Sequence, residues 1–89
     1  MAFLDIQPQA PVHLVVIPKQ HISSLNEVKN EHQSLMGALV LLAQRLAKKE
    51  GIDKKGYRLV INCGPEGGQV VPHIHLHILG GRKLDDRLG

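Results

Sequence analysis

Aromatic residues are almost absent from this 89-residue sequence, which contains one Phe, one Tyr and no Trp. Sheets of the RRM or OB type bind single-stranded nucleic acid by stacking bases on aromatic side chains, so this class is disfavoured. The single cysteine, Cys63, excludes an intramolecular disulfide framework and a cysteine-based zinc site, and it fits a reducing compartment. No apolar run approaches the roughly 18 residues needed to span a bilayer, and no secretory signal is visible. We therefore expect a cytoplasmic protein that binds neither membranes nor nucleic acid.

The rest of the composition is that of a globular protein. Apolar residues make up 43% and charged residues 21% of the chain, and the net charge is +3. A chain of this length forms at most one domain, residues 1–89, and buries a small core, so association into an oligomer is expected. The Lys and Arg residues are dispersed, which indicates a solvated surface with a preference for small anionic ligands.

The pattern of apolar residues predicts an α+β fold. Residues 13–17, 57–62 and 73–79 have the β-branched or alternating character of strands. Between the first two, Leu35, Leu39, Leu42 and Leu46 recur at helical spacing, which predicts a helix from about Asn30 to Lys49. This order favours an antiparallel sheet packed against one long helix. The polar residues 83–89 are expected to form a loosely ordered tail.

Six histidines are an excess for so short a chain, and three of them alternate at His73, His75 and His77. On a strand these three side chains share one face, while Ile74, Leu76 and Ile78 share the other. Such a face could be a polar surface without a role. It could also be a zinc site, in which two histidines at alternate positions bind the metal and His13 or His77 is the third ligand. We favour nucleophilic catalysis on phosphorus, in which one imidazole attacks and its neighbours orient it and transfer protons.

Gly64, Gly67 and Gly68 form a loop directly before the histidine strand. Successive backbone N–H groups in such a loop can point toward one anion, and residues 67–69 are therefore expected to supply donors to a phosphate.

The segment Pro72-His73-Ile74-His75-Leu76-His77-Ile78-Leu79-Gly80-Gly81-Arg82 resembles the signature of the histidine triad (HIT) superfamily. Three further segments resemble its nucleotide-binding (Hint) branch in the same order. They are Asp5-Ile6-Gln7-Pro8-Gln9-Ala10-Pro11-Val12-His13, Val16-Ile17-Pro18-Lys19-Gln20-His21-Ile22 and Gly56-Tyr57-Arg58-Leu59-Val60-Ile61-Asn62, the last followed by Gly67-Gly68-Gln69. The resemblance covers nearly the whole chain and implies a HIT-like fold in a two-fold dimer.

The resemblance also implies roles for individual residues. His75 is the expected nucleophile, His77 binds phosphate and assists the leaving group, and His73 and His13 orient the cluster. The expected nucleotide-binding residues are Asp5, Ile6, Asn62, Gly68, Gln69 and Val70, with Asp5 on the ribose hydroxyls. No role is implied for His21 or His32.

This sequence departs from the family pattern at three places. Val70 stands where a hydroxyl residue is common, and residues 83–89 replace a tail rich in Trp and Pro. Members also carry a helix and strands ahead of the Asp5 motif, so the sequence is expected to lack this N-terminal segment and part of the base pocket.

The expected function is hydrolysis of purine nucleoside phosphoramidates of the AMP–amine type through a covalent nucleotidyl-histidine, without a metal or other cofactor. The partners expected are a purine nucleotide and a second copy of the chain. The alternatives are a nucleotide-binding or partner-binding module with little turnover, a dinucleotide polyphosphate hydrolase and a zinc-binding protein.

Overall fold

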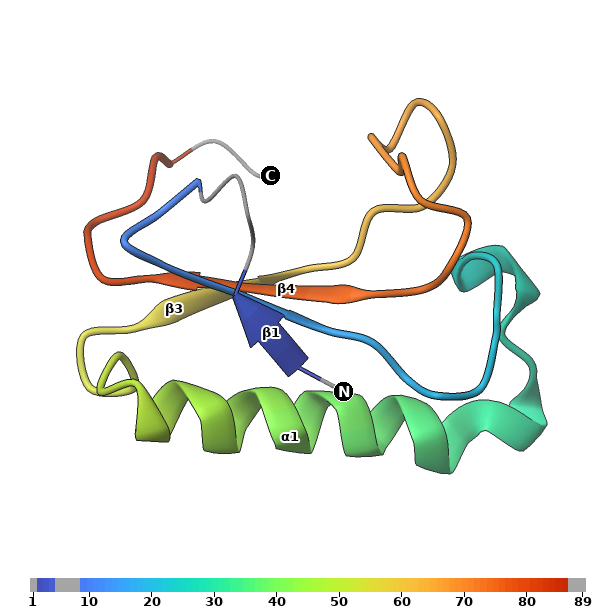
Figure 1. The fold of residues 1–89 in the computed structure, drawn as a ribbon, viewed down its shortest axis with the longest axis horizontal. Helices are drawn as coiled ribbons and strands as arrows, with labels where there is room; N and C mark the ends of the chain where they lie inside the picture. The colour runs from blue at the N-terminus through green and yellow to red at the C-terminus, as the bar shows by residue number, and fades with distance from the viewer. Residues whose placement is uncertain (1, 5–8, 87–89) are drawn as a thin grey trace.

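A computed structural model describes the backbone of residues 2–4 and the whole of residues 9–86. In this part of the chain, one helix, α1 (Gln33–Lys49), lies along one face of an antiparallel sheet (Figure 1). The strands are β1 (Ala2–Leu4), β2 (Val12–Val16), β3 (Tyr57–Val60) and β4 (Leu76–Gly80), and they lie in the order β1-β2-β4-β3. Every neighbouring pair is antiparallel, which confirms the predicted α+β class and the sheet-on-helix arrangement.

The predicted leucine-rich helix is confirmed, although it begins later than expected. Residues 30–32 form the 3-10 turn η2 (Asn30–His32), which follows a similar turn, η1 (Leu25–Glu27). At the other end, Gly51 has φ of 74°, in the left-handed region that favours glycine, and the helix stops there. The Ile52 N–H donates to the Ala47 carbonyl at 3.0 Å and so closes this end.

The core lies between α1 and the inner face of the sheet. Directly paired residues of neighbouring strands share a face, so Leu14 of β2 and Ile78 of β4 both point toward the helix. The buried apolar residues of this core are Leu14, Val16, Leu39, Ala43, Ala47, Ile52, Leu76 and Ile78. Ile74 is buried as well, so the predicted apolar side of the histidine segment is confirmed.

The strand boundaries differ from the predicted ones, most importantly in β4. This strand begins at Leu76 rather than at His73, because the chain bends just before it: Pro72 has no N–H, and the His73 N–H donates to the Val71 carbonyl at 2.8 Å. The alternation of half-buried and buried side chains nevertheless persists through residues 73–79. His73 and His75 therefore keep the predicted orientation without belonging to the strand.

The other differences are smaller. β2 lies one residue earlier than predicted, and β3 ends at Val60, two residues before the expected end. β1 was not predicted, because three residues are too few to show an alternating pattern. Within the residues that the structure describes, no helix combines the length and the apolarity needed to cross a membrane.

The outer face of the sheet, opposite α1, is framed at both ends. Figure 1 shows the segment that follows β3 and the C-terminal segment standing on this side. The part of the predicted tail that is described, residues 83–86, is tied to the sheet by a hydrogen bond from the Arg58 guanidinium to the Asp85 carbonyl at 2.6 Å. The outer face between these segments is where the histidines lie.

Candidate active site

His13 and His77 come together because β2 and β4 are neighbours in the sheet. His77 pairs with Val15 and His13 with Leu79, so both imidazoles stand on the outer face and are offset by two residues. His13 is only 5% exposed and is the one buried polar residue in the described part of the chain. A buried imidazole needs hydrogen-bond partners, and for His13 these are the Gln9 backbone and the His77 ring.

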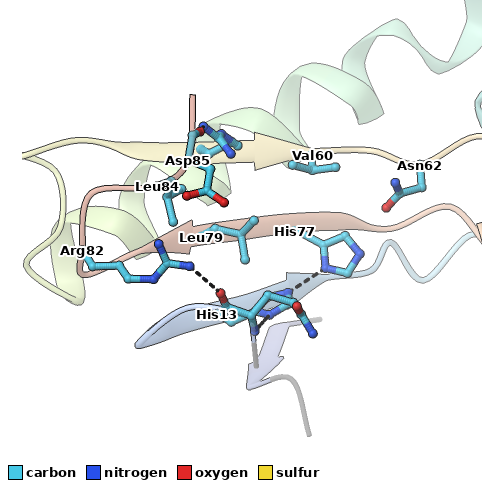
Figure 2. A pocket seen from close by; sticks show the side chains of 10 residues that line it. His13, Val60, Asn62, His77, Leu79, Arg82, Leu84 and Asp85 are labelled. Carbon is cyan, nitrogen blue, oxygen red and sulfur yellow. Dashed lines mark hydrogen bonds between the residues drawn. The ribbon is translucent and has the colours of Figure 1, made fainter. Parts of the chain in front are cut away.

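The partners of His13 fix the proton on each ring of this pair. The Gln9 backbone N–H donates to His13 Nδ1 at 3.0 Å, so this nitrogen is unprotonated. In neutral His13 the proton is then on Nε2, which lies 2.9 Å from His77 Nδ1 and donates to it. Neutral His77 consequently carries its proton on Nε2. Figure 2 shows the two rings facing each other from β2 and β4.

His75 has the opposite tautomer. Its Nδ1 lies 2.8 Å from the carbonyl oxygen of His73, and because a carbonyl only accepts, Nδ1 carries the proton. The lone pair of neutral His75 is therefore on Nε2. The rings of His75 and His77 have centroids 4.9 Å apart and lie nearly edge to face, at 76°. An unprotonated nitrogen thus stands beside a ring that carries a transferable proton, as acid–base-assisted attack requires.

His73 is joined by a histidine for which the sequence indicated no role. His21 Nδ1 lies 3.0 Å from His73 Nδ1, and the ring centroids are 4.9 Å apart. On its other side, His73 Nε2 lies 3.1 Å from the Pro18 carbonyl oxygen. The one available signal was the position of His21 within the Val16-to-Ile22 segment that matched the family pattern. His32 lies apart from this cluster and is contacted by the Lys29 N–H and the Gln20 side chain.

The glycine loop does not have the predicted arrangement of donors. The N–H groups of Gly67 and Gln69 donate to the Gly64 carbonyl, and that of Gly68 donates to the Pro65 carbonyl. The expectation that residues 67–69 direct their N–H groups to an anion is therefore wrong, because the turn uses these donors itself. A Cβ at Gly67 would lie 2.2 Å from the Cys63 carbonyl oxygen, which shows how tightly this turn is closed.

The polar side chains of this loop also hold it in place. Asn62 donates to the Gly67 carbonyl at 2.7 Å. Gln69 accepts from the Gly64 N–H at 2.9 Å and donates to the Ser23 carbonyl at 2.7 Å. Gly68 has φ of 82°, and Val70 is 90% exposed. Nucleotide binding by these four residues stays a prediction, and for Gln69 the structure adds a role in fixing the loop to the segment at Ser23.

A cleft of about 320 Å³ opens on the His13–His77 side of the outer face. Figure 2 shows it between β4, β3 and the C-terminal segment. Its lining residues are Gln9, His13, Arg58, Val60, Asn62, His77, Leu79, Arg82, Leu84 and Asp85. Arg58 and Arg82 were not predicted, because their position depends on how β3 and the C-terminal segment meet. Together they bring two positive charges to this cleft against the one negative charge of Asp85, and this balance suits an anionic ligand.

Two of the predicted nucleotide-binding residues, Asp5 and Ile6, lie outside the described residues. Within the described part, no group of three or more His, Cys, Asp or Glu side chains has an arrangement suited to holding a metal ion.

The fold and the site together define a small α+β protein with clustered imidazoles on the open face of its sheet. Comparison with known proteins agrees with this class. A model of the HIT domain matches residues 1–84. An uncharacterized HIT-like protein of Synechococcus elongatus is 56% identical over 84 residues, which are 94% of this chain and 73% of the relative. The purine nucleoside phosphoramidase of Escherichia coli K12 is 47% identical over 87 residues, which are 98% of this chain and 73% of that enzyme.

Solved structures give the same result. A HIT family hydrolase from Legionella pneumophila has a TM-score of 0.97 and 49% identity, and the match covers 99% of this chain and 79% of the hydrolase. A histidine triad protein from Clostridium difficile has a TM-score of 0.94 and 39% identity, over 98% of this chain and 76% of that protein. This chain therefore belongs to the HIT domain family, as the sequence predicts, and its resemblance to the Hint branch is confirmed.

Proposed function

We propose that this protein hydrolyses purine nucleoside phosphoramidates through a covalent nucleotidyl-His75 intermediate. The observation that carries the proposal is the pair of opposite tautomers at the site. His75 Nδ1 donates to the His73 carbonyl, which leaves the lone pair on Nε2, while His77 carries its proton on Nε2. The similarity to the Escherichia coli purine nucleoside phosphoramidase supports the choice of substrate.

In the first step, His75 Nε2 attacks the α-phosphorus and the bond from phosphorus to the amine nitrogen breaks. The leaving amine takes the Nε2 proton of His77 in its imidazolium form, which becomes a neutral imidazole, and His13, 2.9 Å from His77 Nδ1, orients the ring. The imidazole ring of the His75 adduct is a cation, and the His73 carbonyl oxygen stabilises it by accepting a hydrogen bond from its Nδ1–H.

In the second step, water attacks the same phosphorus on the nucleotidyl-histidine. His77 Nε2, unprotonated after the first step, takes a proton from this water, and the phosphorus–His75 bond breaks. AMP leaves, His77 is again an imidazolium, and His75 is again a neutral imidazole with its lone pair on Nε2. The scheme uses only imidazole groups and water, so it requires no metal ion.

Substrate contacts follow the family resemblance. We assign the phosphate side to Asn62, Gly68, Gln69 and Val70, and the nucleoside to Asp5 and Ile6. The cleft lined by Arg58 and Arg82 lies beside His77 and offers space for the leaving group.

The proposed function is tested by incubating the full chain with adenosine 5′-phosphoramidate and measuring AMP by chromatography. We expect stoichiometric release of AMP and ammonia with repeated turnover. Diadenosine tetraphosphate serves as the comparison substrate and is expected to react more slowly. Binding of AMP in calorimetry without hydrolysis of either compound would instead identify a binding module and contradict the proposal.

We also propose that the protein is a two-fold homodimer formed through α1 and the edge strand β3. Val40 and Leu41 on α1 are 48% and 53% exposed, which leaves an apolar strip on the helix surface. β3 ends the strand order, so one of its edges lacks a neighbouring strand in the described sheet. A second copy would cover both features.

Leu41→Glu is expected to weaken the dimer at least about 100-fold, because an unpaired carboxylate buried in an interface costs several kcal/mol. Light scattering at micromolar concentration should then show a dimer for the wild-type chain and a monomer for the variant. Gln33→Glu adds the same charge at an exposed position at the start of α1 and should stay dimeric. A monomeric wild-type chain would contradict the proposed dimer.

A further inference from the structure

We propose that His21 is a positioning residue that holds His75 in its nucleophilic tautomer by acting through His73. This inference rests on the proposed function, because it concerns the same nucleophile. His21 does not touch His75 in any contact that the structure shows, and it lies on the segment between β2 and η1.

The contacts of His73 determine the direction of each hydrogen bond. Its Nε2 lies 3.1 Å from the Pro18 carbonyl oxygen, which can only accept, so Nε2 carries the proton. Neutral His73 then has its lone pair on Nδ1, and His21 Nδ1 donates to it at 3.0 Å. The ring of His73 is therefore held on both sides, once as a donor and once as an acceptor, and each hydrogen bond favours the same tautomer.

The backbone brings these rings together. The Ile74 N–H donates to the Ile22 carbonyl at 2.7 Å, which joins residues 18–22 to the segment just before β4. Ile22 and Ile74 are only 5% and 2% exposed, so both ends of this bond are anchored in buried positions. His21 and His73 are the residues preceding them, and their side chains meet across the same junction.

The hydrogen bond between His21 and His73 affects His75 through the backbone of His73. The His73 carbonyl oxygen accepts a hydrogen bond from the Nδ1–H of His75 at 2.8 Å, and this contact keeps the His75 lone pair on Nε2. His73 precedes β4 and follows a bend, so the sheet ladder does not fix its peptide unit. The bond from the Ile74 N–H to the Ile22 carbonyl is one restraint on this unit, and the clamped side chain of His73 is the second. Loss of the His21 hydrogen bond frees the His73 ring, leaves its carbonyl with one restraint instead of two, and allows His75 to take the unreactive Nε2–H tautomer.

Three substitutions of His21 separate positioning from bulk structure. In His21→Asn the side-chain amide replaces Nδ1 and keeps the donor, whereas His21→Gln moves the amide to the place of Nε2, and His21→Leu removes it. With adenosine 5′-phosphoramidate, we expect His21→Leu and His21→Gln to lower kcat about five- to tenfold, the usual effect of one lost hydrogen bond, with KM within twofold. His21→Asn should keep kcat within twofold of wild type.

His32→Leu is the matched control, because it changes a histidine of the same region that has no contact with His73. It should leave kcat unchanged. A wild-type kcat in His21→Leu, or an equal loss in His21→Asn and His21→Leu, would overturn the proposal.

A second measurement is independent of activity. Two-bond ¹H–¹⁵N correlation spectra report the tautomer of each imidazole, and we expect Nδ1–H for His75 and Nε2–H for His73 in the wild-type chain. His21→Leu should shift His75 toward the Nε2–H form. An inactive wild-type chain would contradict the proposed function alone, and the spectra would still decide the role of His21. Unchanged His73 and His75 signals in His21→Leu would overturn that role.

Discussion

His75→Asn is expected to lower the rate of AMP release from adenosine 5′-phosphoramidate by at least about 10⁴-fold, because it removes the attacking nitrogen of a covalent mechanism. The asparagine amide can occupy the place of His75 Nδ1 and can still donate to the His73 carbonyl, which is the contact that ties residue 75 to the bend before β4. The variant therefore keeps the local hydrogen bond and loses only the nucleophile. The measurement is AMP formation under conditions in which enzyme exceeds substrate.

The same experiment should show the intermediate directly. Base-stable and acid-labile labelling of the wild-type protein by the nucleotidyl group is expected during turnover, and mass spectrometry of a digest kept at alkaline pH should place the added mass on the peptide that contains His75. His75→Asn should acquire no label, while His32→Asn should behave as wild type. AMP release by His75→Asn within tenfold of the wild-type rate would exclude His75 as the nucleophile.

The sequence predicts the part of this site that depends on local periodicity. Alternation alone places His73, His75 and His77 on one side and buries Ile74, Leu76 and Ile78 on the other, and the structure agrees. The helix is predicted equally well, because apolar residues recur at helical spacing along its 17 residues. Both predictions need only the chain's own geometry, in which a strand repeats every two residues and a helix every 3.6 residues.

What the sequence does not predict depends on contacts between distant segments. His21 and His73 are 52 positions apart and meet because Ile74 binds to Ile22. Arg58 and Arg82 reach the same cleft only through the meeting of β3 with the C-terminal segment. No local pattern marks either arrangement, so periodicity does not distinguish His21, Arg58 and Arg82 from ordinary surface residues.

The glycine loop shows a different limit of sequence reasoning. Gly64, Gly67 and Gly68 correctly indicate a tight turn, with φ of 73° at Gly64 and 82° at Gly68. A turn, however, can direct its N–H groups inward or outward, and here it directs those of residues 67–69 to its own carbonyls. The composition predicted the turn but did not determine which acceptor its donors use.

The two histidine pairs divide the site into separate functions. The pair on the β2–β4 side, His13 and His77, ends in a proton on His77 Nε2. The pair on the other side, His21 and His73, ends at the carbonyl that holds the proton of His75 Nδ1. The His13–His77 pair thus presents an acid, and the His21–His73 pair orients the nucleophile His75. Substrates with different leaving groups should distinguish these two functions.

His77→Ala is expected to slow the first turnover of adenosine 5′-phosphoramidate by about 10²- to 10⁴-fold, since the amine leaves only when it is protonated. The p-nitrophenyl ester of AMP has a leaving group that departs without a proton. For this ester, the first turnover of His77→Ala should stay within about tenfold of wild type, because the nucleophile is intact. Rapid-mixing absorbance should show a burst of one p-nitrophenolate per site, followed by slow hydrolysis of the adduct, because the second step also uses His77.

His13 provides the matched comparison. His13→Gln keeps an amide donor near the place of Nε2 and should retain more phosphoramidate activity than His13→Leu, which leaves His77 Nδ1 without the hydrogen bond it receives from Nε2 of His13. Both variants should react with the ester at near the wild-type rate in the first turnover. If His77→Ala instead loses activity equally with both substrates, His77 contributes to phosphate binding rather than to protonation of the leaving group, and the assignment of the acid must be abandoned.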